Sequence, residues 1–206
     1  MFYLLKNLPD ELFKTIKRPS RVLSLVRPRV IMRYFHSLKI KECTWSNTDS
    51  IQKRFYGSYQ EYLKHQKSKL KIIELSEYNQ AYREALSRRL TETSLIKSGD
   101  NVLCLAARLG AEVQAFIDLG CFAVGLDLNP GKDNKFVVSG DFHEIQYADS
   151  SVEIIFSNSL DHAFNLTLVA REIHRVLKQD GLVIIEAVNG RKEGSGPGNY
   201  ESVFLG

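Results

Sequence analysis

The fold is decided by Asn101-Val-Leu-Cys-Leu-Ala-Ala-Arg-Leu-Gly110, an apolar run that breaks into a loop of small residues. Two further runs each end in a carboxylate: Phe122-Ala-Val-Gly-Leu-Asp127 and Lys135-Phe-Val-Val-Ser-Gly-Asp141. A nucleotide-like ligand that lies across the carboxyl ends of parallel strands needs close backbone approach from the first loop. It also needs a carboxylate for its ribose hydroxyls after the second strand. The three runs therefore predict parallel strands with a ligand at their carboxyl ends.

The alternation of strand and helix continues beyond these runs. We expect strands at residues 101–106, 122–127, 136–139, 152–157 and 182–185, and a turn at Asp180-Gly181 before the last of them. Nearly continuous β-branched runs joined by helices predict an α/β fold with a Rossmann-like, doubly wound and mostly parallel sheet. The helices should direct the following side chains inward: Val113, Phe116, Ile117, Val169, Ile173, Val176 and Leu177.

The pattern stops after Val188, and only residues 202–205 then have the character of a strand. Either the sheet is short by a strand or two at its C-terminal end, or the chain is truncated. The residues before the sheet differ in kind, because Leu5, Leu8, Leu12 and Ile16 recur at helical spacing. Ser58-Tyr-Gln-Glu61 has the form of a capping box that starts a further helix. We therefore divide the chain into a mainly helical, basic extension or lid at 1–95 and a Rossmann-like domain at 96–206.

Charge is unevenly distributed along the 206 residues. Residues 1–74 hold 16 Lys and Arg against 6 Asp and Glu, a balance of +10, whereas residues 75–206 hold 12 against 18, a balance of −6. This split indicates either a basic arm for an anionic partner or a solvated helical surface that happens to be basic. No window offers the roughly 20 apolar residues that span a bilayer. Three scattered cysteines predict neither a disulfide framework nor a metal site, so we expect a cytoplasmic protein.

Residues 95–188 resemble the class I S-adenosylmethionine-dependent methyltransferases. The apolar strand and loop at Val102–Gly110 match the family's first motif, and Gly140-Asp141-Phe142 matches the segment that reads the adenine. The stretch Arg171-Glu-Ile-His-Arg-Val-Leu-Lys-Gln-Asp-Gly181 closely matches the helix and turn before the fifth strand. The segment Tyr56–Leu70 is similar to a helical lead-in that covers the cofactor pocket of some bacterial members. The resemblance implies S-adenosylmethionine as cofactor, no metal, and in-line methyl transfer.

The resemblance also implies a set of cofactor-binding residues, among which Asp127 would hold the ribose hydroxyls. They are Leu105, Ala106, Arg108, Gly110, Asp127, Leu128, Asp141, Phe142 and Asn158. The first loop departs from the family pattern, because Cys104 replaces its acid and Ala106 and Arg108 replace two of its glycines. A replaced glycine at positive φ would cost roughly 1–2 kcal/mol. Arg108 either grips the methionine carboxylate of the cofactor or forms an ion pair with Asp127 or Asp141.

The loop after the fourth strand should open beside the transferred methyl group. We expect His162 to be the general base, with Asp161 beside it; the alternative is a packing or capping histidine. The other histidines are interpreted as His143 in a solvated loop, His174 on an outward helix face, and His65 on a solvated helix. Cys104 is expected to be buried within the first strand and unreactive.

Three functions are compatible with this sequence. The first is a methyltransferase that acts on a small molecule or a saccharide. The second is a non-catalytic binding protein or partner subunit with the same fold, which the altered first loop and the short sheet favour. The third is nucleic-acid methylation guided by the basic first 74 residues, which we disfavour because the fourth strand ends in Asn158-Ser-Leu-Asp161 and not in an Asn/Asp-Pro-Pro-aromatic signature. An exposed last strand would also invite a second copy or another partner.

Overall fold

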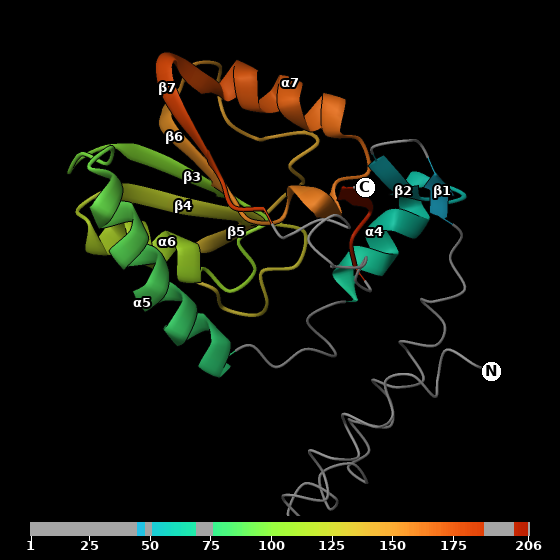
Figure 1. Cartoon of the computed structure of the whole chain (residues 1–206), viewed down its shortest axis with the longest axis horizontal. Coiled ribbons are helices and arrows are strands. Elements are labelled where there is room, and N and C mark those ends of the chain that lie inside the picture. The colour runs from blue at the N-terminus through green and yellow to red at the C-terminus, as the bar shows by residue number, and fades with distance from the viewer. Residues whose placement is uncertain (1–44, 48–50, 69–75, 188–199, 206) are drawn as a thin grey trace, which may run out of the picture. The chain divides into compact units, whose positions relative to one another are not determined.

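A five-stranded parallel sheet forms the centre of the fold in a computed structural model that describes residues 45–47, 51–68, 76–187 and 200–205 (Figure 1). All of these residues belong to one compact unit, Thr44–Gly206. The strand order is β5-β4-β3-β6-β7, and every neighbouring pair is parallel. The strands are β3 (Asn101–Leu105), β4 (Phe122–Asp127), β5 (Val137–Ser139), β6 (Val152–Ser157) and β7 (Leu177–Ile185). The helical spacing expected at Leu5–Ile16 and the stretch after Val188, where the predicted pattern stops, lie outside the described residues.

Helices cover both faces of this sheet, as expected for a doubly wound fold. Helices α5 (Ser76–Thr93) and α6 (Ala111–Asp118) pack on one face, where Cys104 and Phe156 are fully buried. Helix α7 (Leu166–Val176) packs on the other face against Leu103 and Ile155. Burial raises the pKa of the Cys104 thiol, in agreement with the expectation of a buried, unreactive side chain. The alternation of the two faces follows from the period of two along each strand.

One helical side chain lies differently from what the spacing predicts. Ile117 is 41% exposed, although Val113 and Phe116 of the same helix are buried as expected. Leu177 packs against the core as predicted, but from the start of β7, because its backbone is already extended. His174 lies on the exposed side of α7, as predicted.

The turn predicted at Asp180-Gly181 is wrong, because β7 starts directly after α7. Leu177 pairs with Val152, but the next pair joins Leu182 to Ile154, so residues 178–181 form an irregularity opposite a single residue, Glu153. Lys178 forms an ion pair with Glu153 there. A Cβ at Gly181 would come within 2.9 Å of the Glu153 carbonyl oxygen, which explains the glycine without a chain reversal.

A second, antiparallel sheet is built from β1 (Trp45–Asn47), β2 (Ile51–Arg54) and β8 (Val203–Leu205). The predicted strand at 202–205 is therefore present, but it pairs with β2 and does not extend the central sheet. Helix α4 (Tyr59–Lys67) begins as predicted, because the Ser58 hydroxyl accepts from the Glu61 amide at 3.2 Å. The Glu61 carboxylate completes the cap by accepting from the Gly57 amide.

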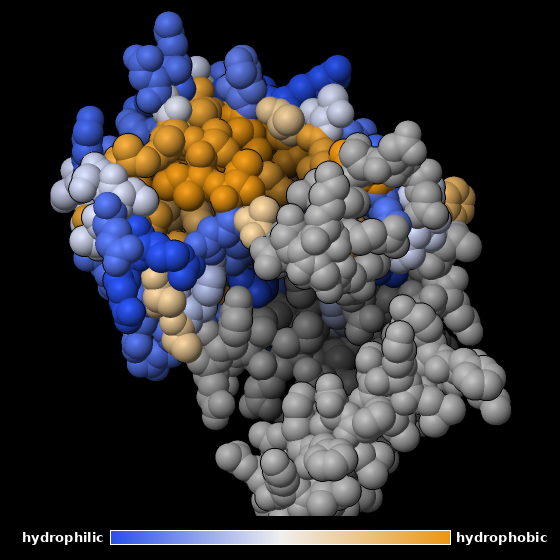
Figure 2. All heavy atoms as spheres, viewed as in Figure 1, coloured by the Kyte–Doolittle hydropathy of each residue, from blue (hydrophilic) through white to orange (hydrophobic). Residues whose placement is uncertain are grey.

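The outer strand β7 pairs with β6 alone among the described strands. Near its end Val183 is 37% and Ile185 53% exposed, and Figure 2 shows a broad hydrophobic area over the central strands. This agrees with a sheet that is short on this side. Among the helices in the described part of the chain, none combines the length and the hydrophobicity needed to cross a bilayer. The division at residue 95 stays a prediction.

Candidate functional site

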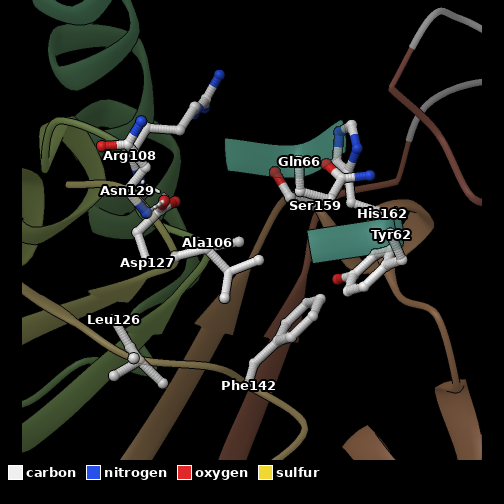
Figure 3. A pocket seen from close by; sticks show the side chains of 12 residues that line it. Tyr62, Gln66, Ala106, Arg108, Leu126, Asp127, Asn129, Phe142, Ser159 and His162 are labelled. Atoms are coloured by element: carbon white, nitrogen blue, oxygen red, sulfur yellow. Dashed lines mark hydrogen bonds between the residues drawn. The ribbon is translucent and has the colours of Figure 1, made fainter. Parts of the chain in front are cut away.

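A pocket lies at the carboxyl edge of the central sheet, where the sequence places the ligand (Figure 3). It encloses about 540 Å³, part of which is open to solvent. Its walls come from the ends of β3 and β4, the loops after β5 and β6, and helix α4. The lining residues are Tyr62, Gln66, Ala106, Arg108, Leu126, Asp127, Leu128, Asn129, Gly140, Phe142, Ser159 and His162.

The pocket brings together six of the predicted site residues: Ala106, Arg108, Asp127, Leu128, Phe142 and His162. The other five do not line it. Leu105 is buried in the core, and Gly110 is the N-cap of α6. Asp141 and Asn158 are engaged in hydrogen bonds beside the pocket, and Asp161 follows Leu160 in a single 3₁₀ turn, η2 (Leu160–His162).

The loop after β3 keeps a glycine-like backbone although its glycines are replaced. Ala106 has a φ of 55° and Arg108 a φ of 49°, both in the left-handed region. Gly110 follows at 89° and donates its amide to the Ala107 carbonyl at 2.7 Å. Each non-glycine residue in this conformation costs roughly 1 kcal/mol or more. The loop therefore keeps this turn at a cost in backbone strain, which is the cost expected where a replaced glycine has a positive φ.

Arg108 holds this loop in place through two different partners, one bonded to its backbone and one to its side chain. Its amide donates to Oδ2 of Asp127 at 2.9 Å, whereas its Nη2 forms an ion pair with Oε1 of Glu112 at 2.8 Å. Figure 3 shows the side chain extending away from Asp127. The ion pair expected with Asp127 or Asp141 is therefore wrong, because α6 offers Glu112 one helical turn beyond the loop.

Asp127 links two of the loops that surround the pocket. Its Oδ2 accepts from the Arg108 amide, and its Oδ1 accepts from the Asn129 amide at 2.8 Å. A carboxylate oxygen has two lone pairs, so each oxygen retains the capacity to accept a second hydrogen bond. Asp127 thus has a structural role in capping both loops and can also accept from a ligand.

His143 is not the solvated loop residue that the sequence suggested, because its side chain is only 3% exposed. Its Nε2 accepts from the amides of Phe164 and Asn165 at 3.1 and 3.2 Å, so the ring proton lies on Nδ1. Nδ1 donates to Oδ1 of Asp141 at 2.7 Å, and the Tyr59 hydroxyl donates to Oδ2. His143 therefore joins the loop after β5 to the start of α7.

The pKa values of Asp141 and of its partner Tyr59 shift in opposite directions. Burial works to raise the pKa of Asp141, but the hydrogen bonds from His143 and Tyr59 outweigh it and hold this pKa below its ordinary value. Burial, reinforced by the bond to Asp141, raises the pKa of the Tyr59 hydroxyl well above its ordinary value. Tyr59 therefore stays a neutral donor that fastens α4 to the loop after β5.

His162 is held in one orientation at the pocket wall. Its Nδ1 lies 2.6 Å from the Tyr200 carbonyl oxygen. Because a carbonyl can only accept, Nδ1 carries a proton, and in the neutral ring Nε2 has the lone pair. Nε2 lies 3.8 Å from Oδ1 of Asp161, near enough for an imidazolium to be stabilised. This geometry suits a general base, and that role remains a prediction.

Helix α4 closes one side of the pocket with Tyr62 and Gln66. Gln66 donates from Nε2 to the Tyr200 carbonyl at 2.8 Å, and Asn129 donates to the Lys67 carbonyl at 2.9 Å. Six lining residues are not among the predicted site residues: Tyr62, Gln66, Leu126, Asn129, Gly140 and Ser159. Four of them are next to predicted residues at strand ends, which is a signal that the sequence contains. Gln66 is recognisable as the position one turn after Tyr62.

The central part of the chain is similar to known proteins. Residues 103–185 match the family model described as a methyltransferase domain. An uncharacterized protein of Methanocaldococcus jannaschii is 31% identical over 121 residues, which cover 54% of this chain and 46% of that protein. The chain therefore spans about half the length of this curated relative.

Two solved structures have a similar fold. A candidate S-adenosyl-L-methionine-dependent methyltransferase of Methanococcus maripaludis has 19% identity and a TM-score of 0.49, over 65% of this chain and 67% of that one. An S-adenosylmethionine-dependent methyltransferase of Aquifex aeolicus has 16% identity and a TM-score of 0.47, over 54% of this chain and 68% of that one.

Proposed function

Because its residues 103–185 belong to the methyltransferase domain family, we propose that this chain binds S-adenosylmethionine at the carboxyl edge of its sheet and methylates a small molecule or a saccharide. The observation that carries the proposal is the pocket itself. It joins a carboxylate at the end of β4, an apolar wall and a histidine with a lone pair at Nε2 in one cavity under α4.

The residues present fit the cofactor. Asp127 can accept the ribose hydroxyls with the lone pairs that its two backbone hydrogen bonds leave available. Leu126, Leu128 and Phe142 provide an apolar wall for the adenine. A Cβ at Gly140 would lie 2.3 Å from Leu126 Cδ1, so the absence of a side chain lets this loop pass close beside that wall.

The bound cofactor supplies a methyl group on a sulfonium, and the chain must position and desolvate the reacting partners. Tyr62 and Gln66 of α4 exclude water from one side of the pocket. His162 Nε2 takes the proton of an acceptor hydroxyl or amine as the oxygen or nitrogen is methylated, and Nδ1 stays bonded to the Tyr200 carbonyl. Asp161 stabilises the resulting imidazolium.

Calorimetric titration with S-adenosylhomocysteine tests cofactor binding by the full chain. Wild type should bind at micromolar concentration, and Asp127→Asn should bind about tenfold more weakly because one ribose acceptor is lost. Asp133→Asn is the matched control, since Asp133 is exposed in the same connection and does not line the pocket. A folded wild-type protein that fails to bind at millimolar ligand would contradict the proposal. If wild type binds, incubation with pooled acceptors tests methyl transfer.

A non-catalytic binding protein or partner subunit is the second candidate, and two observations favour it. Both oxygens of Asp127 already accept hydrogen bonds from backbone amides. Two non-glycine residues at positive φ also strain the loop beside it. A chain that keeps the fold for binding alone should take up S-adenosylhomocysteine poorly and transfer no methyl group to any acceptor. Those two readouts separate the candidates.

A further inference from the structure

One buried carboxylate connects two loops of the pocket without touching the pocket itself. Glu112 in α6 is 2% exposed, and its Oε1 accepts from Arg108 Nη2 at 2.8 Å and from Asn158 Nδ2 at 3.0 Å. Asn158 in turn accepts at Oδ1 from the Ser159 hydroxyl at 2.9 Å. Arg108 and Ser159 line the pocket, and a single oxygen of Glu112 is connected to both of them, directly to Arg108 and through Asn158 to Ser159.

The same network continues from Asn158 to the surface. The Asn158 amide also donates to the Tyr82 hydroxyl at 2.8 Å, and that hydroxyl donates to Glu186. Arg89 pairs with the other oxygen of Glu186. Burial raises the pKa of the Tyr82 hydroxyl well above its ordinary value, so this donor remains protonated. Hydrogen bonds in such a buried network hold its side chains in one arrangement.

The polar end of the pocket lies at Arg108 and Ser159, the two residues of this network that line the pocket. Figure 3 shows Leu126 and Phe142 together on one side and Arg108, Gln66 and Ser159 on the other. The adenine belongs with the apolar side chains, and Asp127 between the two groups belongs with the ribose. The charged amino-acid end of the cofactor is then left for the side that holds Arg108 and Ser159, where a guanidinium can pair with a carboxylate.

We propose that Glu112 is a positioning residue, which holds Arg108 and, through Asn158, Ser159 so that they bind the amino-acid end of S-adenosylmethionine. This inference rests on the proposed function. Its physical basis is that a guanidinium fixed by one hydrogen-bonded carboxylate loses less side-chain entropy when a second carboxylate binds. Arg108 has a φ of 49°, and its side chain reaches Glu112 in α6 from this backbone conformation.

Two ligands that differ only at the amino-acid end provide the test. S-adenosylhomocysteine carries the amino and carboxylate groups, whereas 5′-methylthioadenosine has the same adenine, ribose and sulfur without them. In titrations of the full chain, Glu112→Gln should weaken S-adenosylhomocysteine binding about tenfold and 5′-methylthioadenosine binding less than about twofold. Glu84→Gln, an exposed glutamate on α5, is the matched control and should change neither.

The outcomes separate this inference from the proposed function. Wild type that binds neither ligand would contradict the proposed function itself. Wild type that binds both, with Glu112→Gln weakening both equally, weakening neither, or binding S-adenosylhomocysteine more tightly, would overturn the inference alone. The last result would mean that Glu112 competes with the ligand for Arg108.

A second variant keeps the test open if Glu112→Gln does not fold. Removing one partner of a buried ion pair leaves a charge unpaired, whereas the double variant R108Q/E112Q removes both charges. Its affinity for S-adenosylhomocysteine should fall no more than about threefold below that of R108Q, because the hydrogen bond to Asn158 is then, among the described residues, the only contact through which Glu112 still acts on the pocket. A double variant that binds far more weakly than R108Q would overturn the inference.

Discussion

The amide of Arg108 donates to the carboxylate of Asp127 at 2.9 Å, so the loop after β3 is bonded to the end of β4. The Asn129 amide occupies the other oxygen of the same carboxylate. One side chain therefore holds two loops of the pocket in place before any ligand binds. A residue with both roles should affect folding as well as binding, and the two effects can be separated.

Asp127→Ala should lower the free energy of unfolding by about 1–2 kcal/mol, because two backbone amides lose their acceptor. Asp127→Asn should cost less, since its amide oxygen can still accept from one of them. Urea denaturation of the two variants and wild type measures the difference. Equal stability of Asp127→Ala and wild type would show that water replaces these hydrogen bonds without cost.

Restoring glycine at the two replaced positions of the strained loop should change the free energy of unfolding in opposite directions. Ala106→Gly should raise the free energy of unfolding by about 1 kcal/mol, because glycine adopts a φ of 55° without a Cβ clash. Arg108→Gly relieves the same strain at a φ of 49° but leaves buried Glu112 without its ion-pair partner, so it should be destabilising. Thermal melts of both variants provide the comparison. A stabilising Arg108→Gly would show that the ion pair contributes less than the strain costs.

The sequence predicts the central sheet well, because its strands are continuous apolar runs with loops at their ends. It also locates Ala106 and Asp127, since the carboxyl ends of parallel strands meet at one edge. His143 could not be placed in this way. Its neighbours Asp141 and Glu144 resemble a solvated loop, and only the folded chain brings the amides of Phe164 and Asn165 to its ring.

The resemblance of Tyr56–Leu70 to a lead-in helix indicates that α4 covers the pocket, but the contacts that hold Gln66 there and the pairing of β8 could not be predicted, for a related reason. Gln66 reaches the pocket because α4 is fastened by contacts with residues far along the chain, such as the bond from Tyr59 to Asp141. The pairing of β8 with β2 joins segments about 150 residues apart. Periodicity within a segment carries no information about such partners.

His162→Asn should separate binding from chemistry. The asparagine amide can replace Nδ1 as donor to the Tyr200 carbonyl but offers no base at the position of Nε2. We expect S-adenosylhomocysteine affinity within about threefold of wild type, and methyl transfer reduced roughly 10²-fold. Titration and release of S-adenosylhomocysteine in the presence of a methylated acceptor measure the two quantities. Full turnover by His162→Asn would exclude His162 as the base.

The contacts of Asp141 predict a specific response of stability to acid. Its pKa is lower in the folded chain than in the unfolded one, so its contribution to stability is fully present above the unfolded value of about 3.9. As the pH falls through the folded pKa, the carboxylate is protonated in both states and the contribution disappears. Other acidic groups with lowered pKa values, such as Glu172, act in the same direction, so wild type alone cannot isolate Asp141.

The comparison with Asp141→Asn isolates it. The difference in free energy of unfolding between wild type and this variant should be constant above about pH 5 and should shrink steadily as the pH falls below 4. Asp149→Asn is the matched control, because its carboxylate is 75% exposed and its partner Arg175 also bonds Glu172. Urea unfolding at a series of pH values measures both differences. A gap between wild type and Asp141→Asn that stays unchanged down to pH 2 would show that the Tyr59 and His143 bonds do not depend on the charge of Asp141.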